Sequence, residues 1–201
     1  MENNKTAGMT DVAFDLKGGI LPEGYAFTLW REVVRVLPWL EAEARAGIVP
    51  LRGSASGTDM LLPQRAKLVL RLPMELAAPA GALSGQMLNV DTGVLQVGEG
   101  RERPLQAHPT LHAHLVESTQ EEEVFLADME AQLCQMAITC QWICGKRHTL
   151  KGAGQSLSGY SLVLHDLKPQ ESLQVQGAGL GGSRHFGCGI FVPYKAISGL
   201  E

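Results

Sequence analysis

Short runs of alternating hydrophobic and polar residues predict strands along the first half of the chain, and one longer run has helical spacing. The predicted strands span residues 12–16, 48–52, 60–72 with an interruption at Pro63, and 87–97, where Asp91-Thr92-Gly93 divides the run as in a hairpin. Between residues 25 and 45 apolar side chains recur every three or four positions, which predicts an amphipathic helix that Pro38 kinks or breaks. Residues 17–22 are predicted as a turn and residues 73–78 as a short helix.

The second half of the chain repeats this order of elements, although no repeat of individual residues accompanies it. Strands are predicted over residues 110–116, 138–144, 158–164 and 186–192, with a helix over 121–136 and a short helix over 169–175. Ser118 is predicted to cap the longer helix, whose first turn is acidic where the helix dipole favours negative charge. The repeated order, strand-helix-strand-strand-helix-strand, is typical of the ferredoxin-like unit.

The predicted fold class is therefore α+β, with two ferredoxin-like (βαββαβ, RRM-like) units in tandem and a C-terminal glycine-rich loop. The predicted domains are a disordered N-terminus at residues 1–9, an N-terminal domain at 10–98 and a C-terminal domain at 105–201. Gly, Pro and charged residues cluster in Gly98–Pro104, which predicts a linker there.

Composition limits the class of protein. In 201 residues, 45% are hydrophobic, which is enough for packed cores. The chain lacks an apolar run of about 18–20 residues and an N-terminal signal pattern, so a cytoplasmic location is expected. The net charge of −4 is compatible with nucleic-acid binding because the basic residues are segregated, notably in Lys146-Arg147-His148 with Lys151 and in Arg184-His185.

Two sets of possible metal ligands stand out in the sequence. Cys140, Cys144 and His148 recur at four-residue steps, which would converge only on a helix, whereas this region is predicted as strand and turn. His112 and His114 share one face of a predicted strand, where they could bind a metal, pack or meet solvent. No cofactor is predicted.

Residues 177–195 form the most distinctive segment, with glycines at 177, 179, 181, 182, 187 and 189. Glycine permits close backbone approach and positive φ, and Ser183, Arg184 and His185 add groups that suit a phosphate. The glycines precede a predicted strand, whereas the dinucleotide and triphosphate loops open a helix, so those cofactors are not indicated. A plain glycine-rich turn before a final strand is the alternative interpretation.

The run Gly179–Gly189 resembles the C-terminal glycine-rich signature of the repeat-associated (RAMP) superfamily, specifically of the CRISPR-associated endoribonucleases that cut precursor CRISPR RNA within its repeats. Further matches are Leu37–Leu40, Gly47–Gly53, Arg65–Pro73, Ser172-Leu173 and Gln176. The resemblance spans nearly the whole chain. It implies metal-independent cleavage that leaves a 2′,3′-cyclic phosphate, with the protein staying on the 3′ stem-loop of the mature guide RNA.

The resemblance also implies partners: CRISPR repeat RNA, and the backbone and 5′-handle-binding subunits of an effector complex. The family's usual catalytic His lies near the first helix, but residues 1–107 contain no His. Members without this His rely on Lys, Arg or Tyr to neutralise the phosphate and orient the attacking hydroxyl. A non-catalytic subunit that caps the guide hairpin, and a stand-alone RNA-binding module, therefore remain alternatives.

The candidate site residues follow from this resemblance and from the basic segments. The candidate catalytic residues are Tyr25, Arg31, His148 and His185. The candidate RNA-binding residues are Arg35, Arg52, Lys146, Arg147, Lys151, Gly181, Gly182, Ser183 and Arg184. Arg31 and Arg35 lie one helical turn apart, and the alternative for them is a solvated or salt-bridged face beside Glu32.

Overall fold

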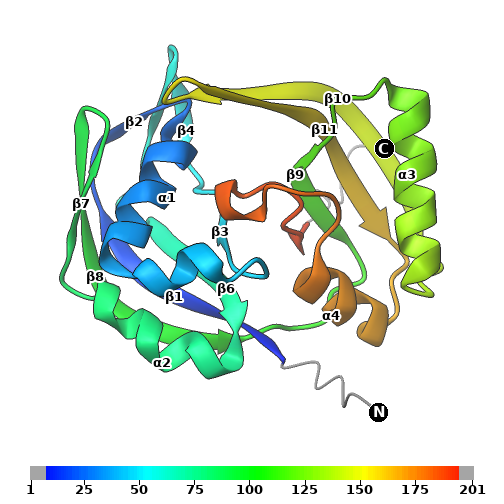
Figure 1. The fold of residues 1–201 in the computed structure, drawn as a ribbon, viewed down its shortest axis with the longest axis horizontal. Coiled ribbons are helices and arrows are strands. Elements are labelled where there is room, and N and C mark those ends of the chain that lie inside the picture. The colour runs from blue at the N-terminus through cyan, green and yellow to red at the C-terminus, as the bar shows by residue number, and fades with distance from the viewer. Residues whose placement is uncertain (1–7, 195–201) are drawn as a thin grey trace, which may run out of the picture. The chain divides into compact units, whose positions relative to one another are not determined.

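The computed structural model describes residues 8–194, which form two compact α+β units (Figure 1). Unit 1 holds the described chain up to Leu105, together with Leu150–Ser156 and Arg184–Gly187. Unit 2 holds the remaining described residues from Gln106 onward. Most of the N-terminal segment predicted as disordered lies outside the described residues, and its last residue, Met9, begins the first strand.

Unit 1 is built on an antiparallel five-stranded sheet in the order β3-β6-β1-β8-β7. Its strands are β1 (Met9–Lys17), β3 (Gly47–Val49), β6 (Lys67–Pro73), β7 (Met87–Val90) and β8 (Gly93–Pro104). Helix α1 (Tyr25–Val36) packs Leu29 and Val33 against Val12 and Phe14 of the central strand β1. Burial of this alternating apolar set explains why the run forms a strand.

The first helix is shorter than the sequence pattern predicts. α1 ends at Val36 and a 3-10 turn, η1 (Pro38–Ala42), follows, so the predicted helix over residues 37–45 is wrong and the predicted break at Pro38 is confirmed. Proline lacks the N–H that would bond the preceding turn, and its ring clashes there. The predicted short helix at residues 73–78 is confirmed as short helical elements that continue further: the 3-10 helix η2 (Met74–Leu76), the α-helix α2 (Ala77–Ala80) and the 3-10 helix η3 (Gly81–Leu83).

A small three-stranded sheet, in the order β2-β5-β4, belongs to the same unit. Its strands are β2 (Ile20–Pro22), β4 (Ser54–Ser56) and β5 (Asp59–Leu61). The prediction of one interrupted strand over residues 60–72 is therefore wrong, because β5 and β6 belong to different sheets. Ala66 N donates to Pro63 O at 3.0 Å, and this turn separates the two strands.

The segment Gly98–Pro104, predicted as a linker, is instead the second half of β8. It pairs with β1 from Phe14↔Gly100 to Thr10↔Pro104, whereas β7 pairs with β8 only as far as Gln96. One edge of this half-strand is thus unpaired by β7, and its charged side chains are exposed. Its polar composition reflects this edge position.

Unit 2 has a four-stranded sheet in the order β10-β11-β9-β12. Its elements are β9 (Leu111–Glu117), α3 (Glu122–Gln135), β10 (Gln141–Gly152), β11 (Gln155–His165), α4 (Pro169–Ala178) and β12 (Val192–Pro193), although the tip of the β10–β11 hairpin belongs to unit 1. Phe125 and Met129 of α3 and Val175 of α4 pack with Leu111 and Ala113 of β9. One face of the sheet is therefore buried by helices.

The predicted final strand over residues 186–192 is mostly wrong. A 3-10 turn, η4 (Arg184–Phe186), precedes it, and only Val192–Pro193 pairs with β9. Gly187 and Gly189 have φ values of 89° and 62°, which lie outside the strand region. The backbone between the turn and β12 therefore cannot be extended.

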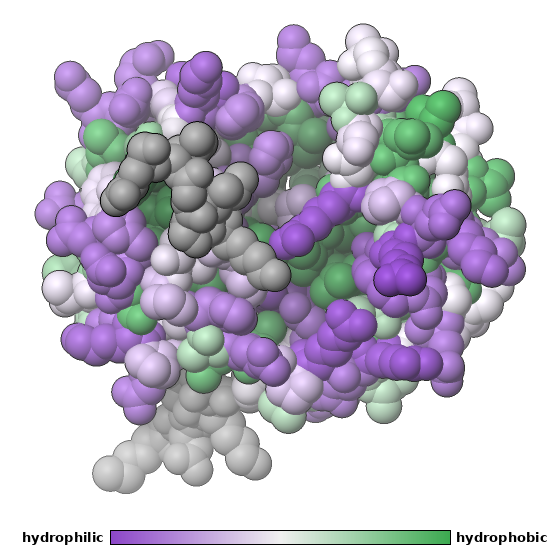
Figure 2. Space-filling model, turned by 180° about the vertical axis from the view of Figure 1, so that it is seen from behind, coloured by the Kyte–Doolittle hydropathy of each residue, from purple (hydrophilic) through white to green (hydrophobic). Residues whose placement is uncertain are grey.

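Hydrophilic side chains cover much of the surface seen in Figure 2, with hydrophobic side chains reaching it in places. The exposed large apolar residues include Ile143 on β10 and Val124 on α3. Scattered residues of this kind are normal on soluble proteins. Among the described residues, no helix is long and apolar enough to cross a membrane.

Candidate functional site

The glycine-rich segment divides into an exposed part and a packed part. Gly181 and Gly182 are exposed, and Ser183 has a positive φ of 53°. Gly181 N donates to Gln132 Oε1 at 3.0 Å. This part of the segment lies at the surface, where Gln132 already accepts from the Gly181 N–H and the Glu117 carboxylate lies beside Gly182.

Gly187 and Gly189 are buried, and their backbone lies against protein. A Cβ added to Gly189 would lie 2.0 Å from Leu180 O, and one added to Gly187 would lie 3.0 Å from Pro50 Cγ. Both positions also have positive φ, so a larger residue would be strained there in two ways. The prediction that the whole segment is kept free of side chains for a ligand is thus wrong for these two glycines.

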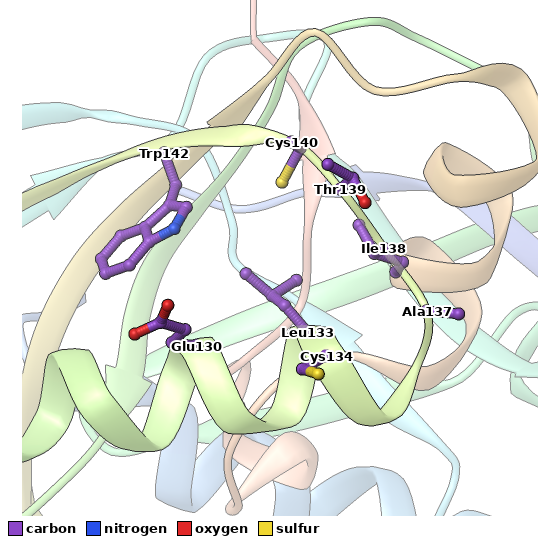
Figure 3. Close-up of a pocket in the computed structure, with 8 residues that line it drawn as sticks. All are labelled: Glu130, Leu133, Cys134, Ala137, Ile138, Thr139, Cys140 and Trp142. Atoms are coloured by element: carbon purple, nitrogen blue, oxygen red, sulfur yellow. The ribbon is translucent and has the colours of Figure 1, made fainter.

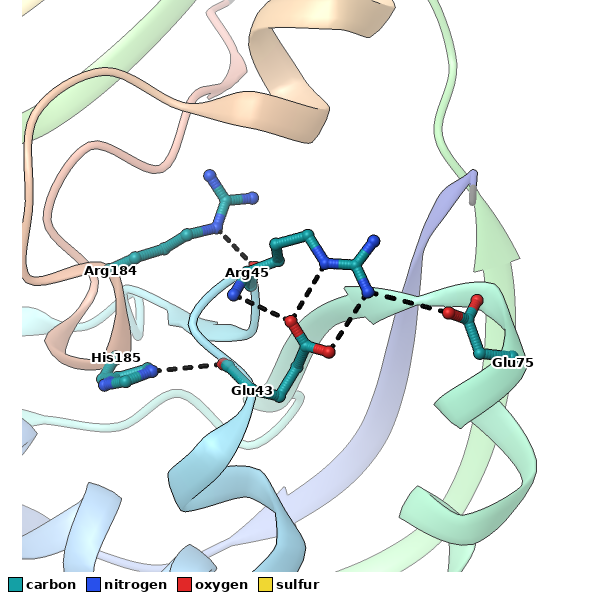
Figure 4. Close-up of polar contacts among 5 residues, drawn as sticks. All are labelled: Glu43, Arg45, Glu75, Arg184 and His185. Carbon is teal, nitrogen blue, oxygen red and sulfur yellow. Dashed lines mark hydrogen bonds and ion pairs between the residues drawn. The ribbon is translucent and has the colours of Figure 1, made fainter. Parts of the chain in front are cut away.

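Arg184 and His185 are held by backbone carbonyls of unit 1 (Figure 4). Arg184 Nε donates to Arg45 O at 2.8 Å, and His185 Nε2 donates to Glu43 O at 3.3 Å. The loop that provides these carbonyls is fixed in turn, because Arg45 pairs with the Glu43 carboxylate at 3.0 Å and with Glu75 at 3.7 Å. The two candidate residues therefore connect η4 to the loop after η1.

The rings of η4 also pack on α1. The His185 ring stacks on Trp30 at 4.4 Å with an angle of 7°, and Phe186 contacts Phe27 at 4.8 Å between ring centroids. Because its ring packs on Trp30 and its Nε2 donates to a carbonyl, His185 makes contacts that stabilise the fold.

The guanidinium of Arg184 has a lowered pKa. Burial, and secondarily the nearby Arg71, lower the pKa of Arg184 to about 10, while Asp11 acts in the opposite direction. Arg71 is itself 1% exposed and binds Asp11 through Nε at 2.8 Å and through its terminal nitrogen at 3.0 Å. Arg184 thus lies near a buried ion pair.

Tyr25 also has a packing role. Its hydroxyl accepts a hydrogen bond from Leu51 N at 2.9 Å, and burial raises the pKa of Tyr25 to about 12. Arg35 on α1 binds Glu32 at 3.0 Å and donates to Met87 O at 3.1 Å. The salt-bridged alternative is therefore confirmed for Arg35. Arg31 and Arg52 are exposed.

Lys151 lies at the beginning of α1, a contact that the sequence did not predict. A Cβ on Gly24 would lie 1.9 Å from Lys151 O, and one on Gly152 would lie 2.4 Å from Gly24 O, so two backbones meet here. Gly24 is the N-cap of α1 and provides no side-chain cap, and the first turn holds no acidic residue. The contact is made by the Lys151 backbone carbonyl, and the Lys151 side chain is exposed. The first turn of a helix carries N–H groups without partners inside the helix and has a positive dipole end.

The sequence gives no signal for this contact. Gly24 and Gly152 lie more than 100 positions apart, and nothing in the sequence indicates that two such glycines meet. The positive groups at the beginning of α1 could hold an anion such as a phosphate oxygen.

In unit 2, the consecutive basic residues 146–148 have different environments. Arg147 lies 5.5 Å from the centre of the Tyr160 ring and donates to Gln120 O at 3.3 Å. Lys146 and His148 are exposed, and the His148 ring stacks with His114 at 5.4 Å. Arg147 thus packs on its own unit, while its neighbours remain accessible.

The helical arrangement of Cys140, Cys144 and His148 is excluded, because Cys144 and His148 lie in β10 and Cys140 directly precedes it. Within residues 8–194, no group of three or more His, Cys, Asp or Glu is placed to hold a metal ion. Burial raises the pKa of the Cys140 and Cys144 thiols, which opposes the thiolate form that metals prefer.

A hollow of about 380 Å³ lies between α3 and β10 in unit 2 (Figure 3). Its lining is about equally polar and apolar and includes two thiols and one carboxylate: Glu130, Leu133, Cys134, Ala137, Ile138, Thr139, Cys140 and Trp142. The carboxylate would repel a phosphate. This hollow therefore does not suit the chemistry of the glycine-rich segment.

Comparison with known proteins identifies close relatives. The family model described as Cas6 Crispr matches residues 10–196. A protein from Myxococcus xanthus (strain DK1622), named CRISPR-associated endonuclease Cas6, is 31% identical over 185 residues, which cover 91% of this chain and 80% of that protein.

Solved structures share the fold. The product of a Cas6-related gene from Pyrococcus furiosus matches with a TM-score of 0.65 and 10% identity, over 92% of this chain and 98% of that chain. Thermus thermophilus Cse3, bound to an RNA representing a pre-cleavage complex, matches with a TM-score of 0.53 and 13% identity, over 92% and 98% of the two chains. The predicted α+β class with tandem ferredoxin-like units is thereby confirmed.

Proposed function

The chain belongs to the Cas6 family of CRISPR RNA-processing endoribonucleases, and on that premise we propose a metal-independent mechanism for it. The 2′-hydroxyl of one nucleotide attacks the adjacent phosphorus, the bond to the 5′-oxygen of the next nucleotide breaks, and a 2′,3′-cyclic phosphate forms. The 2′-hydroxyl loses its proton and the leaving 5′-oxygen gains one. In the transition state, negative charge accumulates on the phosphate oxygens. Preorganised cations therefore lower the activation barrier.

The observation that supports this proposal is the contact of Lys151 with the beginning of α1. In this proposal the Lys151 ammonium and the first-turn N–H groups of α1 bind the scissile phosphate and stabilise its developing charge. The family's usual catalytic His is expected near the first helix, and in this proposal the Lys151 side chain, carried by a backbone segment that contacts Gly24, takes its place as a cation. Gly24 and Gly152 permit the contact because neither leaves room for a Cβ.

The remaining candidate residues receive different roles. Tyr25 and His185 are positioning residues, because the Tyr25 hydroxyl holds Leu51 N and the His185 ring stacks on Trp30. In the same proposal the RNA is contacted by the exposed side chains Arg31, Arg52 and Lys146, by the exposed Gly181 and Gly182, and by the partly exposed Ser183. Phosphate contacts of this kind give affinity with little choice of sequence.

A hairpin-capping subunit is the second candidate function. It is favoured by the absence of His from residues 1–107 and by the contacts that occupy the His185 ring. In either case the protein stays on the 3′ stem-loop of the guide RNA, beside the backbone and 5′-handle-binding subunits of an effector complex.

Single-turnover cleavage of repeat RNA in EDTA separates the two functions. The wild type should cut once, and Lys151→Ala should lower the rate about 100-fold with little change in the Kd, the size expected when one transition-state donor is removed. Lys146→Ala is the matched control from the same hairpin, and at saturating protein its rate should equal that of the wild type. An unchanged Lys151→Ala rate would refute the role of Lys151, whereas tight binding without cleavage by the wild type would support the capping subunit.

Gly24→Ala tests the contact itself. The added Cβ would collide with Lys151 O at 1.9 Å and push the hairpin tip away from α1, so cleavage should fall about 100-fold. Gly19→Ala is the matched control, because a Cβ on Gly19 meets nothing within 4 Å. Equal rates for the two variants would show that the contact does not matter for cleavage.

A further inference from the structure

One face of the unit 2 sheet carries imidazole rings. Leu111 and Ala113 of β9 are buried under α3 and α4, and side chains alternate along a strand, so His112 and His114 project from the opposite face. His114 is exposed and His112 is partly exposed. These rings belong to unit 2, whereas Lys151 belongs to unit 1.

Two further rings extend this pair into a continuous row. Tyr194 lies 5.4 Å from His112, His112 lies 6.5 Å from His114, and His114 lies 5.4 Å from His148, all measured between ring centroids. His148 comes from β10 and Tyr194 follows β12, so the row crosses the whole sheet. Tyr194, His112, His114 and His148 together form the ring row.

The surroundings of His112 and His114 favour the neutral imidazole. Burial, and secondarily the neighbouring imidazoles, lower the pKa of both His112 and His114. The strand β11 lies between β9 and β10 and places uncharged Val163 beside His112. Lys146, two residues before His148 on β10, is expected on the same face and adds a cation beside the rings.

We propose that the ring row is a stacking surface for two or three unpaired bases of the bound RNA. Open sheets of RRM-like units bind RNA by stacking unpaired bases on aromatic side chains of the central strands, and here imidazoles occupy that position. Lys146 would contact a phosphate of the same strand. This inference rests on the proposed function only in taking RNA as the ligand.

The arrangement favours RNA over the other ligands of histidine. Within residues 8–194, the three His of the row do not form a group that could hold a metal ion. The row also has flat polar rings spaced at 5.4–6.5 Å in place of a contiguous apolar patch, which suits bases better than an apolar protein surface.

Binding of hexa-adenylate RNA, measured by fluorescence anisotropy in EDTA, tests the stacking surface. His114→Ala and His148→Ala should each raise the Kd about fivefold or more, since stacking one base is worth that much. His148→Phe should restore the affinity, because the ring and not the imidazole nitrogen does the stacking. His165→Ala is the control, a His outside the row, and should bind as the wild type does.

An abasic ribose-phosphate oligomer of the same length separates bases from phosphates. It should bind weakly and be insensitive to His114→Ala, because it has nothing to stack. NMR locates the binding site. The chemical shifts of the imidazole signals of the row should change on addition of hexa-adenylate, whereas the chemical shift of the His165 imidazole should not. Unchanged affinity of His114→Ala and His148→Ala, or a loss of affinity that His148→Phe does not restore, would overturn the proposal.

The outcome is independent of catalysis. Cleavage of repeat RNA by the wild type in EDTA tests the proposed function, and hexa-adenylate binding tests the ring row. If the row variants alter sedimentation of the free protein and leave RNA binding unchanged, the face binds a second copy of the chain and the proposal is wrong.

Discussion

The first strands of the two units, β1 and β9, bury their apolar faces in the same way and differ on the opposite face. In β1, Asp11 and Asp15 occupy that face. In β9, His112 and His114 occupy it. Each set lies on the side away from the helices, so the apolar pattern alone makes the two strands look equivalent.

The neighbouring strands explain the difference in chemistry. β6 places Arg71 opposite Asp11 and Lys67 opposite Asp15, and both cross-strand ion pairs form. β11 places Val163 opposite His112, and the imidazoles contact one another. The β1 face thus satisfies its charges internally, whereas the β9 face keeps rings available for a ligand.

The largest expected effect comes from breaking the buried ion pair of unit 1. Asp11→Ala leaves the Arg71 guanidinium, 1% exposed, without this carboxylate. Removing one member of a buried ion pair costs about 3–5 kcal/mol. Chemical denaturation should show a loss of that size in the free energy of unfolding.

Asp15→Ala is the control on the same face of the same strand. The Asp15 carboxylate is 57% exposed, and a hydrogen bond from Lys67 lowers its pKa. Solvent replaces this partner, so the loss of stability should be much smaller. Equal losses for the two variants would contradict the distinction between a buried and an exposed pair.

A carboxylate introduced into the ring row should make the β9 face resemble that of β1. His114→Asp should bind hexa-adenylate about tenfold more weakly than His114→Asn, because the added charge repels phosphate in a partly screened setting. The Asn variant removes the same ring without adding charge, so the ratio of the two Kd values isolates the electrostatic effect. A ratio near one would mean that RNA does not approach this face.

The smallest expected effect is on the pH dependence of stability. The folded-state pKa of His112 and of His114 lies below the ordinary value of 6.5, so below pH 6.5 the unfolded chain binds more protons than the folded protein. The free energy of unfolding should therefore fall as the pH decreases from 7 to 5. In the double variant His112→Gln/His114→Gln this decrease should be smaller, and denaturation curves at several pH values measure it. Parallel curves for the two proteins would contradict the lowered pKa values.

Much of the fold could be predicted from local patterns. The alternation in β1, β6, β9 and β11 and the helical spacing in α1 identified those elements, because one face of each must be buried, and the acidic first turn indicated α3. The pattern failed where pairing decides the structure. Gly98–Pro104 has the composition of a linker and is a strand because β1 pairs with it.

The candidate site could be predicted less well. The basic and glycine-rich segments supplied the candidate residues, whose contact with RNA stays a prediction, and the structure leaves Gly181 and Gly182 exposed. The contacts of Arg184 and His185 with the loop after η1 span more than 130 positions of sequence, and the contact of Lys151 with Gly24 spans more than 120. Such pairs leave no local signal.

The sequence by itself determined the α+β class, the repeated order of elements and the residues able to carry charge or protons. These follow from side-chain chemistry and from the periods of helices and strands, which each residue expresses locally. Only the tertiary structure decided which cations are engaged with protein and which remain exposed, and which imidazoles meet. The reason is that burial and pairing depend on strands and loops that come together from distant positions in the chain.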